Sequence, residues 1–125
     1  MIGIGFAATR DLVSFLRYES VDRDGTRNPM IAEGSDAGGT GIAHTLAFGV
    51  SQSGRFLRHF LELGMNDDGG GRRVFDGVLS HVAGADRVFA NHSFAMPGRT
   101  ATQHEDRLYP ENWFPFSNAV HSVMR

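Results

Sequence analysis

Cysteine is absent from this sequence of 125 residues, which excludes both a disulfide framework and a thiolate nucleophile. A basic surplus is also missing, because the net charge is −2, and nucleic acid is therefore a poor candidate for a partner. No run approaches the roughly 20 apolar residues that a membrane-spanning helix needs. The first residues, MIGIGFAATRDL, lack the basic start and small-residue cleavage site of a secretory signal. We therefore expect neither a nucleic-acid nor a membrane partner, and the compartment stays open.

Glycine, in contrast, is abundant, with 16 residues that gather partly in the stretches EGSDAGGTG and DDGGGRR. Such clusters predict surface loops, because glycine loses more backbone freedom on ordering than any other residue. Hydrophobic residues make up 41% of the chain, an ordinary share for a globular protein. The length leaves room for one domain at most.

Four segments have the periodicity of regular structure: helices at 5–18 and 53–64, and strands at 43–50 and 73–84. The second helix stops at Gly64, a residue type that often ends helices. Charge, Asn-Pro and glycine between the first helix and the first strand predict a long loop. The order helix, strand, helix, strand with apolar strands predicts an α/β fold with a parallel sheet.

The chain divides by composition into a core segment of about residues 1–85 and a loop-rich, aromatic region of about residues 86–125. Aromatic residues without a period predict a lid or pocket wall, or else a loop packed on the sheet. Two strands cannot bury both faces of a parallel sheet. We therefore expect residues 1–125 to be part of a larger domain.

The junction GVSQSG joins the predicted strand at 43–50 to the helix that follows it. A serine nucleophile on a sharp strand-to-helix turn needs small residues two before and two after it. Ser51 has Gly49 and Ser53 at these positions, whereas Ser53 would have the bulky Arg55. Ser51 is therefore the candidate nucleophile, and the backbone N–H of Gln52 is a candidate oxyanion donor. The motif alone equally allows Ser51 or Ser53 to be a helix N-cap.

Three further interpretations, one of the same junction and two of other motifs, suggest binding sites and are not favoured by the sequence. The junction matches a phosphate-binding loop in glycine spacing, but Arg55 and Phe56 replace its lysine and hydroxyl. GIGFAA at 3–8 matches a dinucleotide motif, yet it lacks a preceding strand and a following acid, and helix packing explains its glycines equally well. QHED at 103–106 has adjacent acidic and histidine side chains, which rarely converge on one metal ion.

GVSQSGRFLR, GRRVFDGVLSHVAGA and QHEDRLYPENWFPF, in this order, resemble a family of bacterial alpha/beta-hydrolase domain-containing proteins, as does GFAATRDLVSFLRYE before them. The resemblance covers nearly the whole chain and implies an esterase-like serine hydrolase without a cofactor. Ser51 would then attack a small-molecule carboxylic ester. In this fold the second oxyanion donor comes before the nucleophile, and the acid and the histidine follow it. We expect these groups outside the chain.

A triad inside the chain would need Asp86 as the acid and His92, His104 or His121 as the base. We consider it a weaker hypothesis, since GADR around the aspartate is an equally natural turn. His81, at the end of the second strand, is expected to be packed or hydrogen-bonded instead. A non-enzymatic truncated product or binding module is the alternative function, and a dinucleotide-binding domain a weaker one.

Overall fold

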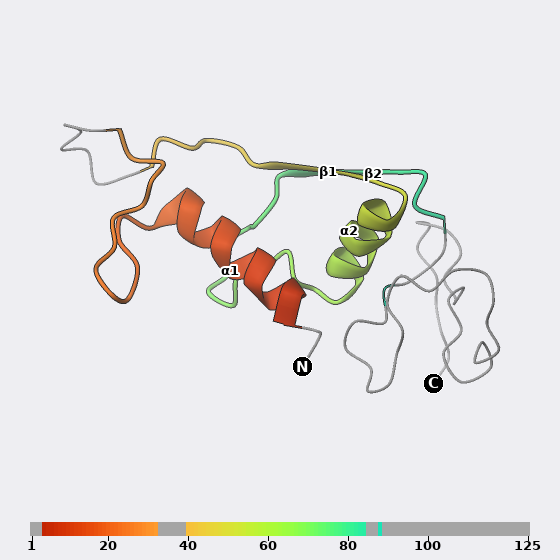
Figure 1. The fold of residues 1–125 in the computed structure, drawn as a ribbon, viewed down its shortest axis with the longest axis horizontal. Helices are drawn as coiled ribbons and strands as arrows, with labels where there is room; N and C mark the ends of the chain where they lie inside the picture. Colours follow the sequence, from red (N-terminus) through yellow and green to blue (C-terminus); the bar gives the residue numbers. More distant parts are fainter. Residues whose placement is uncertain (1–3, 33–39, 85–87, 89–125) are drawn as a thin grey trace.

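The computed structural model describes residues 4–32, 40–84 and 88 of the chain. In chain order the elements are α1 (Ile4–Tyr18), β1 (Leu46–Val50), α2 (Gln52–Glu62) and β2 (Gly77–His81). Figure 1 shows the two strands side by side, with both helices on the same side of them. The predicted α/β order is confirmed, although both strands are shorter than expected. The aromatic region from 89 onward, with QHED, lies outside the described residues.

The two strands pair in parallel, with Leu46 opposite Gly77 and Val50 opposite His81. Strand residues alternate between faces, and Gly49 is buried against α2 while Phe48 is exposed on the other face. Within the described part of the chain, α2 therefore covers one face of the sheet, and the other is bare. The carboxyl ends of both strands meet at one edge, where α2 begins.

The core lies between the helices and the segment that leads into β2. It consists of Phe6 from α1, Phe60 from α2, and Val74 and Phe75 from the segment before β2. Phe56 stacks on Phe6 with 4.6 Å between ring centroids. Such stacked pairs add to the free energy of area burial. This contact accounts for an aromatic side chain where a phosphate-binding loop would need a hydroxyl.

Helix α2 ends at the predicted glycine. Gly64 has φ 72°, and its N–H donates to the carbonyl of Leu61 while the N–H of Met65 donates to that of Phe60. This pair of bonds is the Schellman arrangement, in which glycine takes the left-handed conformation at low steric cost. The chain then reverses toward the start of β2.

Helix α1 is closed at its carboxyl end by Asn28, which is fully buried. Its side-chain amide donates to the carbonyls of Phe15, Leu16 and Glu19. Phe15 and Leu16 lie in the last turn of α1 and Glu19 directly follows the helix, at the end where helix carbonyls run out of partners from a next turn. The predicted loop after α1 is therefore folded back on the helix, which sequence periodicity alone does not show.

The dinucleotide interpretation of GIGFAA is wrong, because residues 19–32 after α1 form a loop and not the strand that would carry the ribose-binding acid. Helix packing does not explain Gly5 either, since a Cβ there would have nothing within 4 Å.

In the described residues, no helix is long and apolar enough to cross a membrane.

Candidate active site

Ser51 lies on the turn between β1 and α2, at the carboxyl edge of the sheet. Its backbone angles are φ 54° and ψ −114°, a conformation that residues other than glycine rarely adopt. Two backbone bonds hold it there: its N–H donates to the carbonyl of His81 at 2.9 Å, and its carbonyl accepts from the N–H of Arg55 at 2.9 Å. The residue is exposed. The turn therefore presents a strained serine to solvent at the end of the strand.

Two glycines allow this turn to form. A Cβ at Gly49 would lie 2.6 Å from the carbonyl carbon and oxygen of Ser53. A Cβ at Gly54 would lie 3.0 Å from the carbonyl oxygens of both Gly49 and His81. Either contact is closer than packed atoms allow without displacement. The requirement for a small residue therefore applies to Gly49, as predicted, and to Gly54.

Ser53 has a different role from the one that the flanking-size rule predicts. Its side chain is exposed, and its hydroxyl accepts the N–H of Val50 at 2.9 Å and donates to the carbonyl of Val50 at 2.8 Å. Bonds from β1 to β2 come from odd-numbered residues such as Thr45 and Ser51, so the polar groups of Val50 face the other edge of the strand. Ser53 thus satisfies the polar groups of the strand edge next to Ser51.

The N-cap interpretation of Ser51 is wrong, because its side chain makes no capping hydrogen bond although the residue occupies the N-cap position. Among the described residues, the N–H groups of Gln52, Ser53 and Gly54 also have no hydrogen-bond partner. The first turn of α2 contains no acidic residue. A helix start of this kind carries partial positive charge and free N–H donors, which favour negative charge placed beside it.

His81 ends β2 beside this turn, and the expectation that it is packed or hydrogen-bonded is wrong for its side chain. The ring is exposed and makes no hydrogen bond to any part of the chain that the structure describes, whereas its carbonyl holds Ser51. Val82 follows with φ 49°, a second strained residue at the same edge. Sequence reasoning missed Val82, because no residue type marks such a conformation except glycine.

The described residues bring no triad together around Ser51. Within 4–32, 40–84 and 88, the nearest thing to a histidine–carboxylate pair is His44 and Asp76, with Nδ1 3.7 Å from Oδ2. His44 lies just before β1, and Asp76 lies just before β2. Because a strand of five residues spans roughly 17 Å, the pair lies at the opposite edge of the sheet from Ser51. Asp86, His92, His104 and His121 all lie outside the described residues. No group of three metal-ligating side chains occurs in the described part.

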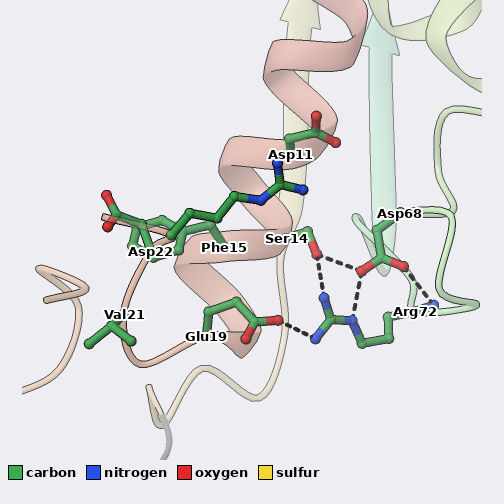
Figure 2. A pocket seen from close by; sticks show the side chains of 9 residues that line it. Asp11, Ser14, Phe15, Glu19, Val21, Asp22, Asp68 and Arg72 are labelled. Carbon is green, nitrogen blue, oxygen red and sulfur yellow. Dashed lines mark hydrogen bonds and ion pairs between the residues drawn. The ribbon is translucent and has the colours of Figure 1, made fainter. Parts of the chain in front are cut away.

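A cavity of about 460 Å³ lies elsewhere, between α1 and the loops at 19–23 and 68–72 (Figure 2). Part of its wall is an internally paired polar cluster: Asp68 accepts from the Ser14 hydroxyl at 2.6 Å and from Arg72 Nε at 2.7 Å. Arg72 also reaches Glu19. Hydrogen bonds, first from Ser14 and then from the backbone at Gly70, hold the pKa of Asp68 well below its usual range. The cluster joins α1 to the loop before β2 and does not include Ser51.

Comparison with protein families identifies this fold. A family model described as the alpha/beta hydrolase domain matches residues 2–118. No curated protein and no solved structure matches the chain. The matched range covers α1, both strands, α2 and the strained turn.

Proposed function

Because this chain belongs to the alpha/beta hydrolase domain family, we propose that it forms the nucleophile-bearing part of a serine hydrolase that cleaves carboxylic esters. Ser51 is the nucleophile. The observation that supports this assignment is the φ of 54° at an exposed serine between a strand and a helix. Alpha/beta hydrolases place their nucleophile on such a turn, where the hydroxyl stands clear of the sheet.

The reaction begins when the Ser51 hydroxyl attacks the acyl carbon of the ester. Its proton passes to a histidine, and the carbonyl oxygen becomes an oxyanion. The N–H of Gln52, the first residue of α2, donates to that oxyanion, and the positive end of the helix lies beside it. Collapse of the tetrahedral intermediate expels the alcohol, which takes the proton from the histidine. Water then releases the acid from Ser51 by the reverse sequence.

The fixed backbone bonds of Ser51 favour this role. The bond to His81 anchors its N–H to β2, and the bond from Arg55 anchors its carbonyl to α2. The nucleophile is therefore held from both sides before a substrate arrives. Catalytic groups held in place before the reaction avoid reorganisation at the transition state.

A fluorophosphonate probe tests the proposal, because it reacts covalently with activated serines and leaves unactivated ones unmodified. The protein should be expressed from its complete natural reading frame. We expect labelling of the wild type, no labelling of Ser51→Ala, and a fall in aryl-ester hydrolysis of roughly a thousandfold or more in that variant.

The control is Ser20→Ala, which removes the hydroxyl of an exposed serine in the loop after α1. Its labelling should equal that of the wild type. Labelling that persists in Ser51→Ala would move the nucleophile elsewhere. A wild type that neither labels nor hydrolyses aryl esters would contradict the hydrolase proposal.

A further inference from the structure

Two neighbouring strands end in strained residues at the same edge of the sheet. Among the described residues, Ser51 with φ 54° and Val82 with φ 49° are the two non-glycine residues with positive φ. For Ser51 the proposed chemistry accounts for the strain. The positive φ of Val82 is the more unusual of the two, because a β-branched side chain in the left-handed region is an outlier.

The turn at Val82 is needed, but the valine side chain is not needed to make it. The turn brings Ala83 beneath the start of α2, where its Cβ lies 3.1 Å from the position of a Cβ on Gly54. Glycine would adopt the same φ without strain, as Gly84 does at φ 61°. Burial offers no compensation either, since Val82 is 69% exposed. Among the residues that the structure describes, the side chain therefore carries a conformational cost without a packing gain.

The position of Val82 suggests what the side chain does. The carbonyl that accepts the Ser51 N–H at 2.9 Å belongs to His81, and the same peptide unit continues into Val82. Val50 pairs with His81 in the ladder, so Ser51 and Val82 follow at equivalent places on adjacent strands. In open α/β sheets, ligands bind outside the carboxyl ends of the strands. Strain that is retained at such an edge points to function.

We infer that Val82 is a specificity-determining residue, whose exposed isopropyl group contacts the apolar chain of an ester bound at Ser51. The inference rests on the proposed function and refines its substrate class. Esters with an apolar chain of several carbons should be favoured over acetate esters and over charged ones. The apolar chain can belong to the acyl or to the alcohol group, and the substrates of the test separate these two sources.

The experiment compares wild type with Val82→Gly in the full-length protein. One series varies the acyl chain of p-nitrophenyl esters from acetate to hexanoate, and a second varies the alcohol of acetate esters from methyl to hexyl. We expect kcat/KM to fall about tenfold for the long-chain substrate of one series and less than threefold for acetate or methyl esters. The melting temperature should stay the same or rise, because glycine removes the strain.

Two further variants separate specificity from structure. Val82→Asn tolerates positive φ and keeps the bulk but is polar, so it should lose the same preference for long chains. Leu46→Ala removes an exposed apolar side chain at the other end of β1 and should leave the preference unchanged. An equal fall for short and long substrates, or no change in either series, would overturn the inference while fluorophosphonate labelling still supports Ser51. If the wild type is not labelled by the fluorophosphonate probe, the hydrolase proposal itself has failed.

Discussion

At the amino ends of β1 and β2, Arg17 donates to the Thr45 hydroxyl and to the carbonyls of Ala43 and Arg73, and pairs with Asp76 at 2.9 Å. At the carboxyl ends, the Ser51 hydroxyl and the N–H of Gln52 have no partner among the residues that the structure describes. Within the described residues, positive φ at non-glycine residues is also confined to this second edge, at Ser51 and Val82. The same two strands thus have one edge whose polar groups are largely paired and one edge whose groups are free to act on a ligand.

The difference separates stability from function. The backbone N–H of Thr45 and the guanidinium of Arg17 hold the pKa of Asp76 below its usual range. Groups that are paired in this way resist rearrangement, whereas exposed donors and strained residues are retained only where a site needs them. Substitutions at the amino edge should therefore change the free energy of unfolding, and those at the carboxyl edge should change reactivity.

The largest effect is expected from Gly49→Ala, which introduces a steric clash at the carboxyl edge. The new Cβ would lie 2.6 Å from the backbone of Ser53, so strand and helix must separate. The free energy of unfolding should fall by roughly 3 kcal/mol, and fluorophosphonate labelling should be lost. Urea denaturation and labelling measure the two effects. Gly5→Ala is the matched control, because a Cβ there has nothing within 4 Å, and it should not destabilise the protein.

Arg17→Met should damage the amino edge alone. It keeps the length of the side chain but removes the donor to the Ala43 carbonyl and to the Thr45 hydroxyl. The Arg73 carbonyl keeps the Tyr18 hydroxyl, and Asp76 keeps a backbone N–H but loses its ion pair. We expect a loss of roughly 2 kcal/mol in the free energy of unfolding. The rate of Ser51 labelling, measured where the variant is folded, should stay within twofold of wild type.

A much slower labelling rate in folded Arg17→Met would show that the two edges are not independent. Arg23→Met is the control. Arg23 is exposed, so its loss should change stability by less than about 0.5 kcal/mol.

Ser53→Ala should loosen the carboxyl edge without adding a clash. It removes the hydroxyl that holds both polar groups of Val50, the residue before the proposed nucleophile. Labelling should slow by roughly three- to tenfold, with a stability loss of about 1 kcal/mol. Ser53→Thr, which keeps the hydroxyl, should restore the labelling rate. Equal rates for Ala and Thr variants would assign Ser53 no role in positioning Ser51.

The smallest effect concerns the cluster around Asp68, which like the amino edge joins elements far apart in the chain. The pKa of Asp68 is lowered in the folded protein, so the contribution of its carboxylate to the free energy of unfolding is present above the unfolded pKa near 3.9. That contribution is lost as the pH falls through the folded pKa. Wild type should therefore lose stability below about pH 4 more steeply than Asp68→Asn. Parallel pH profiles in chemical denaturation would contradict this account of the cluster.

The sequence predicted what depends on local pattern. Apolar periodicity located α1 and α2, Gly64 marked the end of α2, and the small residue at Gly49 marked the turn. The flanking-size rule placed the second small residue at Ser53, whereas the close contacts lie at Gly54, where a Cβ would meet the carbonyls of Gly49 and of His81, which lies far along the chain. The strain at Val82 has no signature in residue type. Contacts such as Arg72 with Glu19 join residues too distant in sequence for periodicity to reveal.

The central claim is that Ser51 is an activated nucleophile, and peptide mass spectrometry of the fluorophosphonate-treated full-length protein tests it most directly. We predict one adduct, on the peptide that contains GVSQSG, with fragment ions that assign it to Ser51 and not to Ser53. Prior heat denaturation should abolish the adduct, because reactivity depends on the folded turn. An adduct on Ser53 or on another peptide, or no adduct in a protein that hydrolyses esters, would contradict the account.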